Sequence, residues 1–213
     1  MPLREYVAEV NVAALRLAIE DLATTFGPRY PGGPEFLRRL AELEPQVQPL
    51  ADKGAQRDAQ QREAWAQLQQ QLTALRDEAL LANPLLDFDR LLLVKRGNNA
   101  PELGLPRNWQ SNSSLAKAGY DDQIAVLSPV RPDGQLTTLF KPDGGRFVGD
   151  VDLDFAAGKL LFSMPGDNKH WQVFEIQADG TGLRQVTGEQ PDVDSYDACY
   201  LADGRILFTS SAC

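Results

Sequence analysis

The sequence predicts a helical N-terminal segment followed by antiparallel β-sheets. Residues 1–83 carry apolar side chains at intervals of three and four, which is typical of helices. After Pro84, short runs rich in β-branched and aromatic residues alternate with Asp-Gly turns. One hairpin sequence in this second part occurs again 46 residues later, at Gly158 and Gly204. The predicted fold class is therefore α+β by segments: a helical hairpin followed by an incomplete all-β propeller of antiparallel four-stranded blades.

The first predicted helix covers the sequence REYVAEVNVAALRLAIEDLATTFG. Two apolar rows run along it, Val12, Leu15, Ile19, Leu22 and Phe26 in one, and Val7, Val10, Ala14 and Leu17 in the other. Gly27 and Pro28 end it, because glycine permits a left-handed cap and proline cannot continue the hydrogen-bond ladder. A short second helix is predicted around residues 35–44, ended by Pro45 and Pro49.

A long helix is predicted from about Gln56 to Ala82. Its narrow apolar seam consists of Trp65, Leu68, Leu72, Leu75 and Ala79. We expect it to form an antiparallel hairpin packed on the first helix; the alternative is an intermolecular coiled coil. Asn83-Pro84 ends this helix and separates a helical region, 1–83, from a partial propeller, 84–213.

The repeat that predicts the blades is a strand, a tight turn and a second strand. DFAAGKLLFSM at 154–164 matches YLADGRILFTS at 200–210, and LDFDRLLLVKR at 86–96 is interpreted as an earlier copy. The remaining strands of each unit come from QIAVLSPVRPDGQLTTL at 123–139 and WQVFEIQADGTGLRQV at 171–186. Two to three copies are fewer than the roughly 4 to 8 blades of a closed ring. We therefore expect a fragment of a larger protein, with the remaining blades supplied by sequence outside these residues.

Composition excludes several classes of function. The 30 acidic and 21 basic residues leave a formal net charge of −9, which argues against a nucleic-acid partner. Neither a membrane span nor a secretory signal peptide is evident in the sequence. With Cys199, Cys213 and His170 as the only cysteines and histidine, zinc-finger spacing and a Cys-x-x-Cys-His haem attachment are absent. We expect this chain to bind no cofactor, with the possible exception of the calcium ion considered next.

A metal-site prediction rests on Asp150, Asp152 and Asp154. Their alternate spacing would place the three carboxylates on one face of a strand, or let them converge on calcium in a loop. A similar acidic run, Asp192, Asp194 and Asp197, precedes the next copy of the hairpin. The alternative is that both runs are solvated starts of strands, whose carboxylates bond to neighbouring loops.

Contacts with a protein or small ligand are predicted in the loops between strands. The insertion between residues 97 and 122 supplies Trp109, Asn112 and Tyr120, and His170 precedes a later strand. The alternative for the insertion is disorder or packing under the ring. The alternative for His170 is a structural role, since no carboxylate is expected to converge on it.

No catalytic residue is predicted. Ser128, Ser163 and Ser210 fall in strands rather than in a Gly-x-Ser-x-Gly turn. Cys199 is expected to lie opposite Phe208, which would leave Cys213 too far away for a disulfide.

The sequence EIQADGTGLRQVTG, followed by YLADGRILFTS, resembles the TolB-like, WD-type propeller repeat. Within that group, GLPRNWQSNSSLAKAGYDDQIAVLSPVRPDG, FVGDVDLDF and DVDSYDACYLADGRILFTSSAC look like the propeller region of hydrazine synthase alpha subunit-like proteins, chiefly from planctomycete-type bacteria. The resemblance implies export to the periplasm or another extracytoplasmic space, and in some members c-type haem and redox chemistry.

Two functions follow from this resemblance. The first is a non-catalytic propeller module that binds a protein or a small ligand within a larger exported protein. The alternative is the propeller portion of a haem-dependent redox enzyme similar to the hydrazine synthase alpha subunit, with haem c bound by sequence outside these residues.

Overall fold

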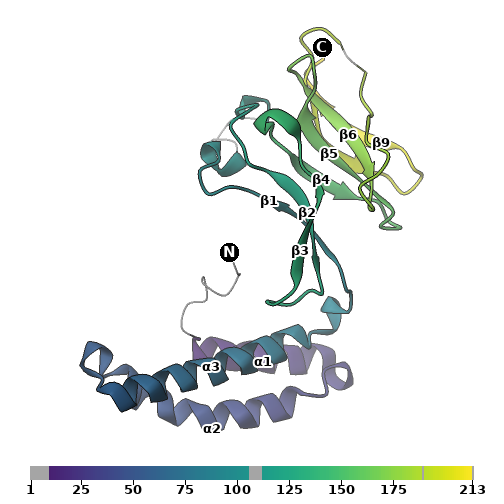
Figure 1. Cartoon of the computed structure of the whole chain (residues 1–213). Coiled ribbons are helices and arrows are strands. Elements are labelled where there is room, and N and C mark those ends of the chain that lie inside the picture. The colour runs from purple at the N-terminus through teal and green to yellow at the C-terminus, as the bar shows by residue number, and fades with distance from the viewer. Residues whose placement is uncertain (1–9, 106–111, 189, 213) are drawn as a thin grey trace. The chain divides into compact units, whose positions relative to one another are not determined.

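The computed structural model describes residues 10–105, 112–188 and 190–212 (Figure 1). The chain divides into two compact units. A helical unit contains Met1–Asp89 and the turn Pro129–Gly134, and a sheet unit contains Arg90–Ser128 and Gln135–Cys213.

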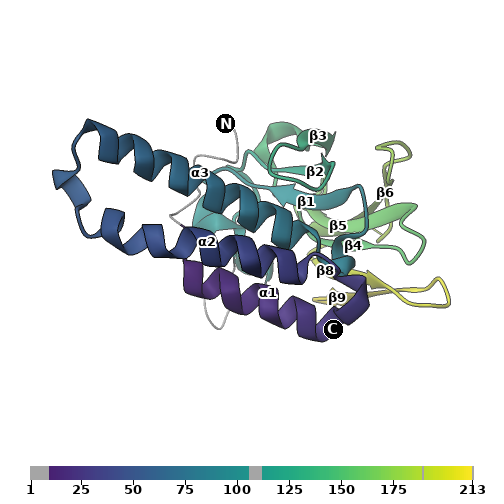
Figure 2. The same ribbon diagram turned by 90° about the horizontal axis from the view of Figure 1, so that it is seen from below.

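The helical unit contains three α-helices that pack side by side, α1 (Val12–Phe26), α2 (Gly33–Ala51) and α3 (Ala59–Leu81) (Figure 2). The side chain of Asn11 caps α1, and Asp58 forms a reciprocal capping box with Gln61 at the start of α3. The predicted seam of α3 is confirmed: Leu68, Leu72, Leu75 and Ala79 are buried, and Trp65 packs partly buried against the same core. They join residues from α1 and α2 in one core, so a helix bundle stabilises this unit.

The prediction that Pro45 and Pro49 end the second helix is wrong. Both prolines lie inside α2, which continues to Ala51. Each proline removes one helical hydrogen bond, but both lie on the exposed side of the helix, where freed carbonyl groups meet water. Val47 and Leu50 pack against the core on the other side and hold the last turns in place.

The sheet unit contains three antiparallel sheets, with the strand orders β1-β2-β3, β4-β5-β6-β7 and β8-β9. The strands are β1 (Leu91–Lys95), β2 (Gln123–Ser128), β3 (Gln135–Phe140), β4 (Gly149–Leu153), β5 (Lys159–Pro165), β6 (Trp171–Gln177), β7 (Arg184–Gln185), β8 (Ser195–Tyr200) and β9 (Ile206–Ser210). The predicted succession of a helical segment and antiparallel sheets is thus confirmed. Of the three sheets that the described strands form, only β4-β5-β6-β7 has four strands.

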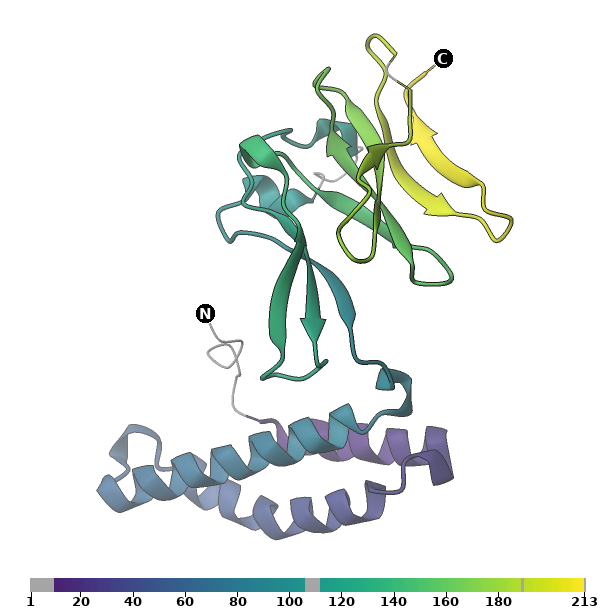
Figure 3. The same ribbon diagram turned by 45° about the vertical axis from the view of Figure 1, so that its right-hand side comes forward.

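The hairpins β4–β5 and β8–β9 are two copies of one structure. The pairing register shifts between Gly149 and Asp152 in the first, and between Tyr196 and Cys199 in the second, so each contains a bulge. β8 packs on the preceding sheet, where Ala198 and Tyr200 share a core cluster with residues of β5 and β6 (Figure 3). The predicted repeat therefore corresponds to a repeated hairpin with the same irregularity at the same place.

Candidate functional site

An acidic cleft lies between the two copies of the hairpin, within the sheet unit. Its volume is about 530 Å³. Three consecutive residues from each of β4, β8 and β9 line it: Asp150, Val151, Asp152, Asp197, Ala198, Cys199, Leu207, Phe208 and Thr209. Carboxylates from both acidic runs of the sequence thus meet at one site.

The two bulges create this site. Asp150 and Asp197 occupy the same position in their respective hairpins and both have left-handed backbone, with φ of 50° and 55°. Aspartate adopts this conformation more readily than most residues, because its short side chain can bond to the local backbone. The bulges interrupt the alternation of side chains along each strand. Asp150 and Asp152 lie in β4, whereas Asp154 follows the end of that strand, so the three carboxylates do not share one strand.

These three carboxylates have different surroundings. Asp152 Oδ2 accepts a hydrogen bond from the Tyr200 backbone N–H at 2.8 Å, which ties β4 to β8. Asp154 Oδ1 accepts from the backbone N–H groups of Lys159 at 3.0 Å and Gly158 at 2.6 Å, closing the β4–β5 turn. These hydrogen bonds lower the pKa of Asp154, and the bond from Lys159 has the largest effect.

Calcium binding stays a prediction. Within residues 10–105, 112–188 and 190–212, no group of three or more His, Cys, Asp or Glu side chains is arranged to hold a metal ion. Asp150 and Asp152 line the cleft, whereas Asp154 does not.

The lining of the cleft is partly apolar. It includes the exposed residues Leu207 and Phe208 of β9, together with Thr209 and the half-buried free cysteine Cys199. Carboxylates beside exposed apolar surface suit a ligand that carries a positive charge on an aliphatic or aromatic group. The cleft therefore has the chemistry of a binding site for a cationic group.

A buried ionic network holds the cleft's second hairpin in place. Glu175 of β6 accepts hydrogen bonds from Lys159 Nζ at 2.9 Å and from the Tyr200 hydroxyl at 2.8 Å, and it pairs with Arg184 at 2.6 Å. Burial alone would raise the pKa of Glu175, but these donors together outweigh it and lower the pKa. The pKa of Tyr200 is raised mainly by burial and, to a smaller extent, by its hydrogen bond to Glu175. Sequence reasoning missed this network, although a glutamate inside the apolar run WQVFEI was the signal for it.

Tyr120, predicted to contact a ligand from the insertion, does not line the cleft. Tyr120 is buried and packs edge-on against Phe147, with ring centroids 5.3 Å apart. The guanidinium of Arg96 lies over both rings and its Nη2 donates to the Val148 carbonyl at 2.8 Å. Tyr120 thus belongs to a buried cluster with Leu115, Phe147 and Trp171. Trp109 and the side chain of Asn112 lie outside the described residues.

His170 does have carboxylate neighbours, contrary to the sequence-based expectation. Its Nδ1 lies 3.2 Å from Asp194 Oδ1, and its Nε2 lies 3.8 Å from Asp192 Oδ1. Asp194 also accepts from the Trp171 backbone N–H at 2.9 Å. This contact fastens the β5–β6 loop to the start of β8; none of the three residues lines the acidic cleft.

The register of the last hairpin corrects one further prediction. Cys199 lies opposite Leu207, next to the predicted Phe208, because the turn closes with a hydrogen bond from the Leu201 N–H to the Arg205 carbonyl and this sets the register. Cys199 is a free thiol, and Cys213 lies outside the described residues.

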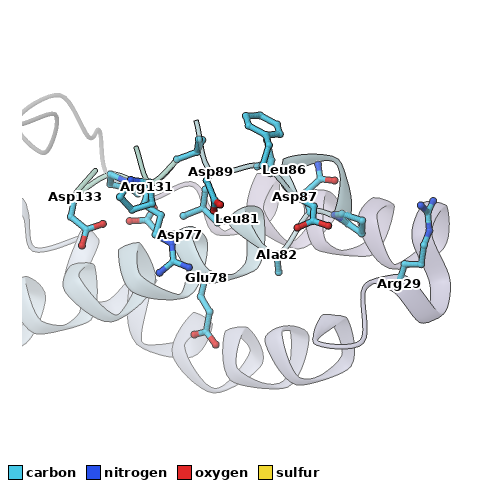
Figure 4. Close-up of a pocket in the computed structure, with 16 residues that line it drawn as sticks. Arg29, Asp77, Glu78, Leu81, Ala82, Leu86, Asp87, Asp89, Arg131 and Asp133 are labelled. Carbon is cyan, nitrogen blue, oxygen red and sulfur yellow. The ribbon is translucent and has the colours of Figure 1, made fainter. Parts of the chain in front are cut away.

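A second pocket, of about 820 Å³, lies in the helical unit (Figure 4). Sixteen residues line it, among them Asp77, Glu78 and Arg131. They come from the end of α3, the segment after it and the turn at 129–134, with Arg29 from the segment after α1. Asp77 pairs with Arg76 at 2.6 Å and Glu78 with Arg39 at 2.7 Å, and neither arginine lines the pocket. We place the candidate site in the acidic cleft, because carboxylates from both copies of the repeated hairpin line it.

Comparisons with known proteins do not add to this description: no family model matches the chain, and no match was found among curated proteins. Within the described part of the chain, no helix combines the length and the apolar character needed to cross a membrane.

Proposed function

We propose that this chain is a non-catalytic binding module of the β-propeller kind, within a larger exported protein, and that its acidic cleft receives a cationic group of a protein or small ligand. The observation that carries the proposal is the pair Asp150 and Asp197. They occupy equivalent bulges in successive hairpins and line a single cleft.

Two features support a propeller. β8 and β9 repeat the pairing and the bulge of β4 and β5, and β8 packs face to face on the preceding sheet. Stacked antiparallel sheets related by a regular repeat are the construction principle of propellers. In such a fold, irregularities at equivalent positions of successive blades bring side chains together on the same side of the stack.

Backbone geometry supports a binding role for the cleft. Non-glycine residues with left-handed backbone cost free energy, and proteins tend to retain them where a side chain must be aimed at a ligand. Asp150 and Asp197 both have this geometry, and two nearby carboxylates attract a cation from solution. Leu207 and Phe208 supply apolar contact beside them.

The test is a titration of the 15N-labelled chain with agmatine, which carries a guanidinium and an ammonium at the two ends of a short alkyl stem; binding is followed by the chemical shifts of the backbone amides. We expect saturable shifts around Asp150, Asp197 and Leu207. The double variant D150N/D197N should bind about fivefold or more weakly, since each exposed charge pair contributes up to about 1 kcal/mol.

The matched control is D133N/D167N, which removes the same charge from two exposed positions outside the cleft. It should bind agmatine as the parent chain does. Equal weakening in both double variants, or no saturation in the parent, would overturn the proposal. Saturation by CaCl2 but not by agmatine would replace it with the calcium site predicted from the sequence. A c-type haem absorption band in the full-length protein would overturn its non-catalytic part.

A further inference from the structure

Two hydrogen bonds fasten β8 to the preceding sheet, one at each end of the part that lines the acidic cleft. The Ser163 hydroxyl of β5 accepts a hydrogen bond from the Asp197 backbone N–H at 3.0 Å. The Asp152 carboxylate of β4 accepts one from the Tyr200 backbone N–H at 2.8 Å. The three residues with which β8 lines the cleft begin at Asp197 and end just before Tyr200, so the two bonds bracket them.

The bond to Ser163 compensates for the bulge in β8. Pairing with β9 stops at Tyr196 and resumes at Cys199, so Asp197 has no partner in the register of this hairpin. The N–H of a residue that leaves the ladder of a sheet needs another acceptor. Ser163 supplies it from a fully buried position, 0% exposed, where water does not take its place.

Both copies of the hairpin carry a hydroxyl group at this position. Ser163 lies opposite Gly149, and Thr209 lies opposite Tyr196; in each copy the partner is the residue just before the bulged aspartate. Ser163 therefore stands beside the first bulge through its backbone and holds the second through its hydroxyl. This one residue is placed to fix the two bulges relative to each other.

The direction of the Asp197 side chain depends on the bulge. Left-handed backbone, with φ of 55°, costs free energy at an aspartate and persists only where the surroundings favour it. Relaxation to regular pairing would shift the register by one residue, and such a shift turns side chains to the other face of a strand. The buried hydroxyl thus controls whether the Asp197 carboxylate faces the cleft that Asp150 also lines.

We propose that Ser163 is the positioning residue of the acidic cleft: its hydroxyl holds the β8 bulge in the form that aims the Asp197 carboxylate at a cationic ligand. The role toward a ligand rests on the function proposed above, whereas the hold on the bulge does not. Ser163 is not among the residues that line the cleft, so it acts through Asp197.

Two measurements on the 15N-labelled chain test the two parts separately. In S163A, the Asp197 amide should exchange with solvent about tenfold or more faster, because its N–H loses its acceptor. Agmatine should bind S163A roughly threefold more weakly than the parent chain, which is within the range of one exposed charge pair. In the D197N background, S163A should weaken binding no further, because the carboxylate that it positions is absent. S163T keeps the hydroxyl and copies Thr209, so it should restore both properties.

The matched control is T187V, which removes another buried hydroxyl of the sheet unit. Thr187 Oγ1 accepts a hydrogen bond from the Val173 backbone N–H at 3.1 Å and does not line the cleft. T187V should therefore speed amide exchange at Val173, leave Asp197 unchanged, and bind agmatine like the parent chain.

Three results would overturn the inference: unchanged exchange at Asp197 in S163A, equal weakening of agmatine binding by S163A and T187V, or equal weakening by S163A with and without the Asp197 carboxylate. If the parent chain did not bind agmatine, the proposed function would fail. Faster exchange at Asp197 in S163A but not in T187V would still identify Ser163 as the residue that holds the bulge.

Discussion

At the scale of single residues, the most consequential side chain is Glu175. Only 5% of its side chain is exposed, and it connects β5, β6, β7 and β8 through Lys159, Arg184 and Tyr200. A buried carboxylate is tolerated only when donors compensate for the water it has lost, and here three side chains do so. Removing its charge therefore leaves several donors unsatisfied at once.

We expect Glu175→Gln to lower the free energy of unfolding by about 2 kcal/mol at pH 7, as is typical when a buried charged hydrogen bond is broken. Urea denaturation followed by circular dichroism measures this. The matched control is Asp167→Asn, which removes a charge from a fully exposed side chain of the same unit. An equally large loss of unfolding free energy in the control would show that net charge, rather than the hydrogen-bond network of Glu175, determines the stability change.

The same residue predicts a pH dependence. Because the pKa of Glu175 is lowered from 4.5 in the folded state, its carboxylate stabilises the fold above the unfolded-state value. This contribution is lost as the pH falls below 4.5 and through the lowered pKa. The difference in unfolding free energy between the parent chain and Glu175→Gln should therefore shrink from pH 7 to pH 3. A difference that is unchanged at pH 3 would contradict the assigned network.

Residue-level prediction from the sequence succeeded where periodicity applied. The buried seam of α3 followed from its spacing, because every member repeats the same helical face. The roles of Asp150 and His170 did not follow, since they depend on a bulge and on a contact with Asp194 that is distant in sequence. Neither feature leaves a local pattern.

At the scale of elements, the bulges of β4 and β8 are the distinctive structures. Each combines a register shift with one aspartate in left-handed backbone. Sequence analysis found the repeat but not its bulges, because an extra residue in a strand looks the same as a longer strand. It also misjudged α2, because Val47 and Leu50 pack against the core and keep the helix going past Pro45 and Pro49, and this tertiary contact is not visible in the local sequence.

Substitutions at Asp197 test the bulge directly. Asp197→Val should destabilise the chain by about 1–3 kcal/mol, because a β-branched residue is strained at positive φ. Asp197→Gly should be tolerated in comparison, because glycine adopts this backbone without a steric cost. Thermal denaturation of the two variants under identical conditions checks the order of stability. If valine were as stable as glycine, β8 would have no left-handed residue at this position.

At the scale of the whole molecule, the described hydrophobic clusters fall into two sets. One contains only residues of the helical unit, and the other three contain only residues of the sheet unit. The overall order of helices and sheets could be predicted from the sequence, because composition changes abruptly at Pro84. Sequence patterns could not show whether the sheets close into a ring, because they reveal repeats but not the number of sheets that pack together.

Separate cores predict that a core mutation in one unit acts on that unit. Leu72→Ala, at a fully buried position of α3, should destabilise the helical unit by about 2–5 kcal/mol. Leu17→Ala, at a position that is 66% exposed, should cost far less. Native-state hydrogen exchange should show lost protection in α1–α3 and unchanged protection in β5 and β6. Equal loss in both units would contradict the division.

The short connection between β5 and β6 has a consequence for the order in which the chain folds. Seven consecutive residue pairs join these strands across residues 166–170, so closing this loop costs little conformational entropy. Pairing of β1 with β2 must instead close the chain across residues 96–122. We expect the β5–β6 hairpin to form early and, during synthesis, to be complete before β8 emerges. The later hairpin then condenses on a finished surface, so the acidic cleft is the last part of the sheet unit to take shape.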